Sequence, residues 1–286
     1  MSESNLLLRV HDLTMQFGGL RAIDGLSMAA RAGEVTSVIG PNGAGKTTFF
    51  NCLTGFYKPT SGSLTLSHPT RGALRLDAMR SVQVTRMAQV VRTFQNIRLF
   101  PRMTVLENLM VAQHNALQRA SRFSIAGALN LTTYRRAHQA AIEDAMKWLT
   151  RLSVAEVADK ATGDLPYGIQ RRVEIARAMC TGPLLLCLDE PAAGLNPKES
   201  AELTALLRSL AKDQGIGILL IEHDMSVVMK VSDHIVVLNH GKKIAEGSPA
   251  SIRTNPDVIS AYLGEDDDDS PESSISIAPQ GRSANA

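Results

Sequence analysis

Cysteine is scarce in this chain. Among its 286 residues there are three cysteines, Cys52, Cys180 and Cys187, and they lie far apart in the sequence. So few thiols exclude a disulfide framework and a cysteine-rich zinc site. We therefore expect reduced thiols and a reducing compartment such as the cytosol.

Long hydrophobic runs are absent as well. The longest apolar stretches cover residues 183–188 and 216–221, whereas a membrane-spanning helix needs about 20 apolar residues. Residues 1–5 contain no lysine or arginine, and we expect no secretory signal there. Any association with a membrane is therefore expected to depend on partner proteins.

Aromatic residues are few and the net charge is small. Aromatic side chains make up 4% of the chain, and the formal net charge is +2. Because acidic residues are concentrated in residues 265–286, residues 1–264 alone carry a net charge of +7. A basic domain suits phosphate ligands or an anionic surface. No cluster of basic and aromatic residues indicates a nucleic-acid surface, so we expect no nucleic-acid partner.

The chain does contain several short runs that are mainly apolar. Hydrophobic residues make up 44% of the sequence, which is enough for a buried core. Strands without polar alternation are typical of a parallel sheet covered by helices on both faces. We predict four of them, at residues 35–39, 184–188, 217–221 and 235–238. The sequence therefore predicts an α/β fold.

The stretch between about residues 103 and 179 differs from the rest because it favours helix. Residues 137–152 have apolar side chains at helical spacing and include the single tryptophan, Trp148. We interpret this stretch as a helical subdomain inserted between early and late strands of the sheet. The predicted division is a core at residues 1–94 and 180–248, a helical subdomain at 95–179, a closing element at 249–264 and an acidic, disordered tail at 265–286.

A glycine-rich segment follows the first of these strands. It fits the P-loop (Walker A) pattern G-x-x-x-x-G-K-[ST] in full. Glycines let backbone N–H groups turn toward phosphates, and the N-terminus of the following helix favours anions. Lys46 is expected to reach the β- and γ-phosphates and the Thr47 hydroxyl to bind Mg²⁺. The predicted ATP-binding residues here are Gly40, Pro41, Asn42, Gly43, Ala44, Gly45, Lys46, Thr47 and Thr48.

A strand that ends in two carboxylates supplies the second half of such a site. Asp189 and Glu190 follow the apolar run at residues 184–188. Asp189 is expected to hold Mg²⁺ through water, and Glu190 to act as the general base on an attacking water. Both motifs together disfavour an accidental glycine-rich turn, and they predict a nucleotide bound with Mg²⁺.

Three further segments, in this order along the chain, carry a family resemblance. They are residues 168–172, residues 189–197 and residues 221–224. Together with the P-loop, they resemble the nucleotide-binding domain of ABC transporters over about residues 7–264, so residues 1–264 are interpreted as one ABC ATP-binding domain. The resemblance implies a P-loop NTPase with a RecA-like core, a mainly parallel sheet and an inserted helical subdomain. It also implies that two such domains sandwich two ATP molecules head to tail.

The resemblance assigns roles to individual residues. Phe17 matches the aromatic residue that stacks on adenine, and Gln95 matches the glutamine that senses Mg²⁺ and the attacking water. His223 matches the histidine that contacts the γ-phosphate. Asn196 stands where the family has an aspartate in the loop that links the two sites. These matches imply Gln95, Glu190 and His223 as catalytic residues, and Thr47, Gln95 and Asp189 as metal-binding ones.

The signature segment departs from the family pattern. Where the family has Leu-Ser-Gly-Gly-Gln, residues 165–169 read Leu-Pro-Tyr-Gly-Ile. Pro166 has neither a hydroxyl nor a backbone N–H to donate. Gly168 is retained, and by the resemblance it binds the γ-phosphate held by the opposite subunit.

Further similarity narrows the family to one group. Residues 92–101, 103–109, 172–178 and 255–264 are similar to the ATP-binding subunit of branched-chain amino-acid importers. By that resemblance the chain energises import at the cytoplasmic face of the bacterial inner membrane, where permeases hold it. The implied partners are two membrane permease subunits, a second and different ATPase subunit, and a periplasmic amino-acid-binding protein.

Two other classes fit part of the sequence. One is an ABC ATPase without transport, acting on nucleic acid or the ribosome; such proteins usually carry two motif sets or long coiled coils, and this chain has one set and no coiled coil. The other is a P-loop kinase, which has no use for His223 or for the helix that begins at Gly168.

Overall fold

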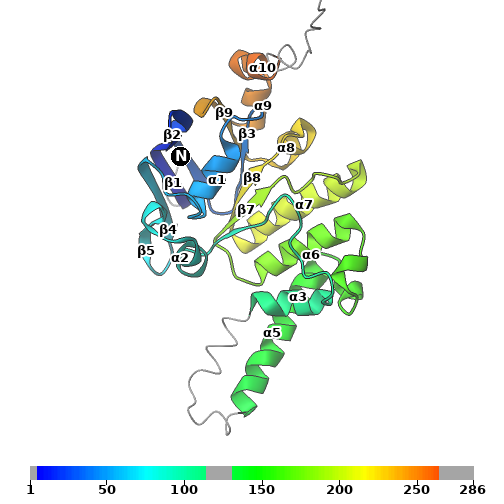
Figure 1. Cartoon of the computed structure of the whole chain (residues 1–286). Coiled ribbons are helices and arrows are strands. Elements are labelled where there is room, and N and C mark those ends of the chain that lie inside the picture. Colours follow the sequence, from blue (N-terminus) through cyan, green and yellow to red (C-terminus); the bar gives the residue numbers. More distant parts are fainter. Residues whose placement is uncertain (1–4, 114–130, 264–286) are drawn as a thin grey trace, which may run out of the picture.

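A six-stranded sheet forms the centre of the molecule (Figure 1). The computed structural model describes residues 5–113 and 131–263, of which residues 131–134 and 263 are described by their backbone alone; the predicted acidic tail lies outside these ranges. The strand order is β10-β9-β3-β8-β7-β6, and all neighbours are parallel except β10 and β9. The strands are β3 (Val35–Ile39), β6 (Val90–Arg92), β7 (Leu185–Asp189), β8 (Gly217–Ile221), β9 (His234–Asn239) and β10 (Lys242–Gly247). The predicted α/β fold with a mainly parallel sheet is confirmed.

The central strands are buried because both faces of the sheet are covered. Every residue of β3, β7 and β8 is buried. Successive side chains along a strand point to opposite faces. Accordingly Leu185 and Cys187 pack with the N-terminal part of the chain, and Leu186 and Leu188 pack with the helices of the other face.

A second, antiparallel sheet covers one face together with α1. Its order is β2-β1-β4-β5, formed by β1 (Leu6–Phe17), β2 (Leu20–Arg31), β4 (Ser61–His68) and β5 (Gly72–Arg75). Helix α1 (Lys46–Leu53) buries Phe49 and Phe50 in the core that this sheet shares with the central one. The short α2 (Ser81–Met87) leads into β6. The sequence did not predict this second sheet.

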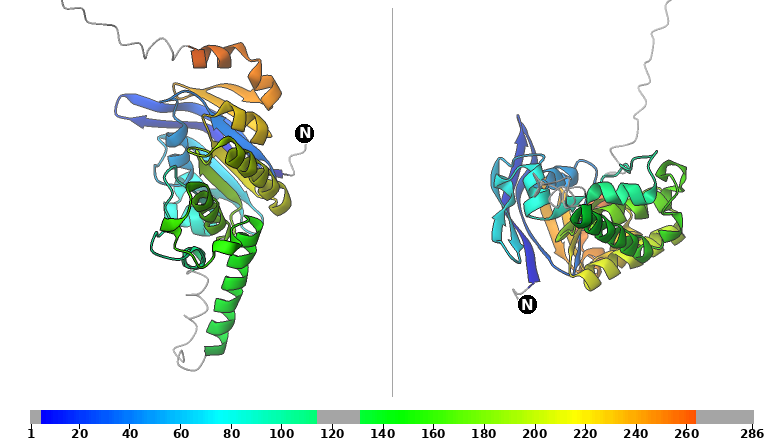
Figure 2. Two further views of the ribbon diagram at one scale, coloured as in Figure 1. Left: turned by 90° about the vertical axis from the view of Figure 1, so that its right-hand side faces the viewer. Right: turned by 90° about the horizontal axis from the view of Figure 1, so that it is seen from below.

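Helices cover the other face. They are α3 (Val105–Ala112), α5 (Leu131–Arg151), α6 (Tyr167–Met179), α7 (Pro197–Gln214) and α8 (Met225–Val231). Leu109 of α3, Trp148 of α5 and Val173 of α6 share one hydrophobic cluster. Helix α5 extends away from the rest of the described chain (Figure 2). Helices therefore occupy much of the interval between β6 and β7, as the sequence predicts.

The last described helices, α9 (Pro249–Arg253) and α10 (Pro256–Leu263), pack at the end of the molecule opposite to α5 (Figure 1). Ile252 of α9 and Val258 of α10 lie in a cluster with Ile235 and Val237 of β9. In the part of the chain that the structure describes, no helix has both the length and the apolar character needed to cross a membrane.

Candidate functional site

The P-loop is a tight turn between β3 and α1. Its glycines adopt positive φ angles, 146° at Gly40 and 100° at Gly45. A Cβ at Gly40 would lie 2.0 Å from the Leu238 carbonyl oxygen, and one at Gly45 would lie 2.3 Å from that of Ala22. Neither position accepts a side chain, so the turn depends on glycine. Gly45 caps α1 without a side-chain hydrogen bond, which leaves the first N–H groups of the helix to an anion.

Lys46 lies over the P-loop. Its Nζ donates to the carbonyl oxygens of Gly40 at 2.5 Å and Pro41 at 2.7 Å. Lys46 also lines a cleft of about 450 Å³ that contains Phe17 and the P-loop residues from Asn42 to Thr48. An ammonium group at this place puts positive charge where phosphate groups would meet the helix N-terminus.

Phe17 lines the same cleft. It is the last residue of β1, and 42% of its surface is exposed. Its ring lies edge-on to that of Tyr57, with centroids 5.3 Å apart. The exposed face of a ring held in this way is available for stacking on a base. Several residues that sequence reasoning missed line this cleft too, namely Leu20, Arg21, Ala22 and His240.

Glu190 is the point at which the predicted catalytic side chains meet. It directly follows β7 and has a φ of 46°, which is uncommon for a residue other than glycine. Gln95 Nε2 donates to Glu190 Oε2 at 2.7 Å. His223 Nδ1 lies 3.7 Å from the same oxygen. Glu190 also lines the P-loop cleft, so the structure brings together residues from three strand ends beside the phosphate-binding turn.

Asp189 is held by an arginine that the sequence did not indicate. Arg92 Nη2 donates to Asp189 Oδ2 at 2.6 Å, and Arg92 Nη1 donates to Asn51 Oδ1 at 2.6 Å. Arg92 ends β6, which is paired with β7. The side chains of Arg92 and Asp189 are 7% and 10% exposed. The pair therefore fixes the carboxylate at the end of β7 in a largely buried setting.

Glu222 is a second functional candidate that sequence reasoning missed. It is buried beside His223, and its Oε1 accepts a hydrogen bond from the Ala192 N–H at 2.8 Å. Burial raises the pKa of the Glu222 carboxyl group, because desolvation disfavours its charged form. Glu222 thus ties the turn after Glu190 to the strand that carries His223.

The residues available to Mg²⁺ are oxygen donors. Thr47 offers a hydroxyl, Asp189 the carboxylate oxygen that Arg92 leaves open, and Gln95 an amide oxygen. Among the described residues, no group of three or more His, Cys, Asp or Glu side chains forms a metal cage. Mg²⁺ ordinarily uses one or two carboxylates together with nucleotide phosphates and waters. The donor set therefore fits Mg²⁺ bound with a nucleotide.

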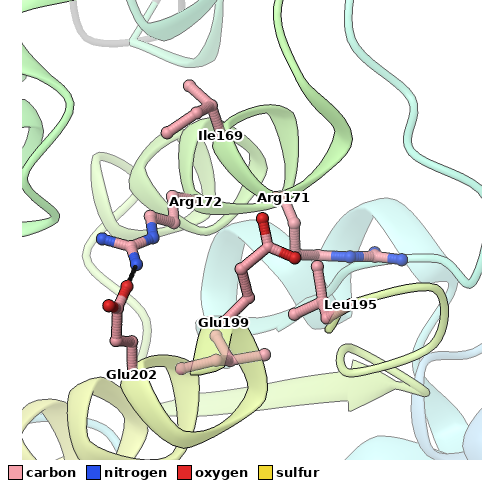
Figure 3. A pocket seen from close by; sticks show the side chains of 8 residues that line it. Ile169, Arg171, Arg172, Leu195, Glu199 and Glu202 are labelled. Atoms are coloured by element: carbon pink, nitrogen blue, oxygen red, sulfur yellow. Dashed lines mark hydrogen bonds and ion pairs between the residues drawn. The ribbon is translucent and has the colours of Figure 1, made fainter. Parts of the chain in front are cut away.

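Gly168 does not join the P-loop cleft. It lies at the start of α6 and lines a separate pocket of about 210 Å³ between α6 and α7 (Figure 3). A Cβ on Gly168 would lie 2.8 Å from Glu199 Oε1. Pro166 precedes α6, and its carbonyl oxygen accepts the N–H groups of Ile169 and Gln170, both at 3.0 Å. Within this chain, the start of α6 therefore belongs to a different surface from the P-loop.

Asn196 caps α7, between Leu195 and Glu199, which both line that second pocket. Its Oδ1 accepts the N–H groups of Lys198 and Glu199, both at 3.0 Å, and Glu199 Oε2 accepts the Asn196 N–H at 3.0 Å. This reciprocal arrangement is a capping box, which asparagine satisfies as well as aspartate.

Comparison with known proteins finds matches over most of the chain. Residues 23–193 match the family described as ABC transporter, and residues 242–268 match the family described as branched-chain amino acid ATP-binding cassette transporter.

Two named relatives are similar over nearly their whole length. The high-affinity branched-chain amino acid transport ATP-binding protein LivG of Salmonella typhimurium is 53% identical, covering 92% of this chain and 99% of its own. The corresponding protein BraF of Pseudomonas aeruginosa is 50% identical with the same coverage.

Solved structures are similar as well. The ADP conformation of an ATP-binding cassette of an ABC transporter is 30% identical, with a TM-score of 0.76 over 91% of this chain and 99% of that one. A nucleotide-free cassette from an ABC transporter is also 30% identical, with a TM-score of 0.74 over 90% of this chain and 98% of that one.

Proposed function

Because the chain belongs to the ABC transporter family of ATP-binding proteins, we propose that it is the ATPase subunit that drives import of branched-chain amino acids. Binding and hydrolysis of ATP and the energising of an ABC importer follow from the family. The choice of branched-chain amino acids draws on the relatives' names and on the match at residues 242–268.

The observation that carries the proposal is the meeting of Gln95, Glu190 and His223 beside the P-loop. In the proposed reaction, the P-loop N–H groups and Lys46 bind the phosphates, and the ring of Phe17 stacks on the adenine. Glu190 accepts the proton of the attacking water, and Gln95 holds the Glu190 carboxylate in place through the hydrogen bond that its Nε2 donates. His223 contacts the γ-phosphate.

Mg²⁺ is the proposed metal cofactor. Thr47, Asp189 and Gln95 would hold it, with water between Asp189 and the ion, and it would neutralise charge on the phosphates when bound. Arg92 keeps the Asp189 carboxylate in its place at the end of β7.

A second ATPase subunit is proposed to complete the site. The separation of Gly168 from the P-loop within the chain supports this, because the start of α6 is then free to meet the ATP bound by a head-to-tail partner. The proposed assembly also has two membrane permeases and a periplasmic amino-acid-binding protein, and the permeases hold the chain at the cytoplasmic face of the inner membrane. Residues 95–179 are proposed to form the helical subdomain, and residues 1–94 and 180–248 the core.

Hydrolysis by the assembled importer tests the proposal. The full chain is reconstituted in proteoliposomes with its permease, ATPase and binding-protein partners, and ATPase activity is measured with leucine, isoleucine or valine and with lysine as the comparison. We expect stimulation by the branched-chain amino acids and none by lysine. Equal stimulation by lysine would contradict the substrate class, and no ATPase activity under any condition would contradict the function itself.

A further inference from the structure

Among the fully buried side chains in the described part of the chain, that of Arg171 is the largest by volume, and the residue is 0% exposed. It lies in the first turns of α6, and it donates to the carbonyl oxygens of Phe94 at 3.0 Å and Gln95 at 2.7 Å. A guanidinium group can serve both carbonyls because its donors form a flat fork. The main chain at Gln95 is therefore fixed to α6.

Tyr167 and Glu174 complete the surroundings of Arg171 on the same face of α6. Arg171 Nη2 donates to the Tyr167 hydroxyl oxygen at 2.8 Å, and Arg171 Nη1 donates to Glu174 Oε2 at 2.8 Å. The other carboxylate oxygen of Glu174 accepts the Arg98 N–H at 3.2 Å. The segment from Phe94 to Arg98 is thus attached to α6 at both ends.

The ring of Tyr167 also touches the turn that follows Glu190. A Cβ at Gly194 would lie 3.5 Å from Tyr167 Cε1, so the ring lies against the main chain there. A backbone hydrogen bond joins the same turn to Glu190, because the Glu190 carbonyl oxygen accepts the Ala193 N–H at 3.2 Å. Tyr167 therefore contacts the segment after Glu190 directly and the Gln95 segment through Arg171.

We propose that Tyr167 and Arg171 are positioning residues for ATP hydrolysis. They hold the Gln95 main chain and the turn after Glu190 on one helix, so that the Gln95 amide stays within hydrogen-bond distance of the Glu190 carboxylate. The inference rests on the proposed hydrolytic roles of Gln95 and Glu190. The inference depends on the side chain of Tyr167. The general family motif has glycine at this position, and glycine has no side chain that could make these contacts.

Conservative substitutions test this role in the assembled transporter. Tyr167→Phe removes the hydroxyl that Arg171 contacts and keeps the ring on Gly194, so we expect kcat for ATP to fall roughly three- to tenfold with KM unchanged. Arg171→Lys keeps a charge beside Glu174 but loses the fork, and a larger fall in kcat, on the order of ten- to a hundredfold, is expected. Neither side chain lines the P-loop cleft of its own chain, so the affinity of the purified single chain for ATP should be retained.

Arg151→Lys is the matched control. Arg151 Nη2 forms an ion pair with Asp213 Oδ2 at a distance of 2.6 Å, and this pair is remote from the site. The kcat of this variant should equal that of the unaltered chain. Thermal unfolding of each purified variant shows whether a change reflects folding, and a loss of kcat that follows a loss of ATP affinity and stability would overturn the positioning role.

A double-mutant comparison decides whether Tyr167 acts through Gln95. In a Gln95→Ala background, Tyr167→Phe should cause no further loss of kcat, since the side chain that it positions is already gone. Losses that multiply in the double variant, or an unchanged kcat in Tyr167→Phe alone, would overturn the proposal. These outcomes can be told apart from a failure of the proposed function. If the proposed function is wrong, the unaltered transporter itself will show no ATPase activity.

Discussion

Replacing Arg92 with methionine should destabilise the chain, because it leaves the Asp189 carboxylate buried without its cation. The two side chains are 7% and 10% exposed and are joined at 2.6 Å. Removing one partner of a buried ion pair costs about 3–5 kcal/mol. Part of this is offset because Arg92 Nε is buried without a hydrogen-bond partner, and losing such a donor returns about 1 kcal/mol. The expected net loss in the free energy of unfolding is about 2–4 kcal/mol.

Urea denaturation of the purified full chain measures this loss, and Arg151→Met is the matched control. The Arg151–Asp213 pair has the same 2.6 Å distance, but its side chains are 30% and 57% exposed. The control should therefore lose less than about 1 kcal/mol.

A double variant tests the cause. Asp189→Asn combined with Arg92→Met removes both charges, and it should recover at least about half of the loss seen in Arg92→Met alone. A loss in Arg92→Met no larger than in the control, or no recovery in the double variant, would refute the reasoning.

Lys46→Ala should weaken ATP binding at least about a hundredfold, because it removes the cation from the phosphate end of the cleft; equilibrium binding that stays within a few-fold of the unaltered chain would contradict the assigned pocket. Glu222→Gln should remove the free-energy cost of ionising the buried Glu222 carboxyl group in the folded chain, a cost that grows with pH. The pKa of Glu222 is raised in the folded chain above its ordinary 4.5, so its contribution to stability is fully present below that value and is lost as pH rises through the raised folded pKa. The Tm of the variant should therefore improve relative to the unaltered chain between about pH 4 and pH 8, and a constant difference across that range would argue against a raised pKa.

The central strands and the P-loop could be predicted because their signals are local. β3, β7, β8 and β9 are mainly apolar, without regular polar alternation, and each was placed within about one residue of its observed ends. The glycines that the turn between β3 and α1 requires stand together in the sequence, so the turn and the helix after it could be located as well.

The antiparallel sheet gave no comparable signal. Along β1 the burial pattern does not alternate regularly, and its pairing with β2 shifts register at Val10/Leu13 and Leu13/Met15. Such irregularities break the two-residue period that identifies a half-buried strand. The strands were therefore missed although they are among the longest in the chain.

The supporting residues of the site were missed for a different reason. The Arg92–Asp189 pair joins residues that are 97 positions apart, and the Arg171 contacts to Phe94 and Gln95 span 77 and 76. Nothing in the neighbouring sequence marks these pairs, because only the packing of β6, β7 and α6 brings them together. Gln95, Glu190 and His223 were identified through motifs, but their meeting at one carboxylate needed the structure.

ATP-driven uptake of labelled leucine is the measurement that tests the central claim most directly. Proteoliposomes hold the reconstituted transporter with ATP on the side of this subunit and leucine with the binding protein on the other. We compare the unaltered chain with Glu190→Gln, which keeps the shape of the side chain but cannot accept the proton of water; loss of such a base typically costs about 10²- to 10⁴-fold in rate. The account predicts uptake with the unaltered chain and, for Glu190→Gln, retained ATP binding without hydrolysis or uptake. Leucine uptake that is independent of ATP, or unimpaired in Glu190→Gln, would contradict it.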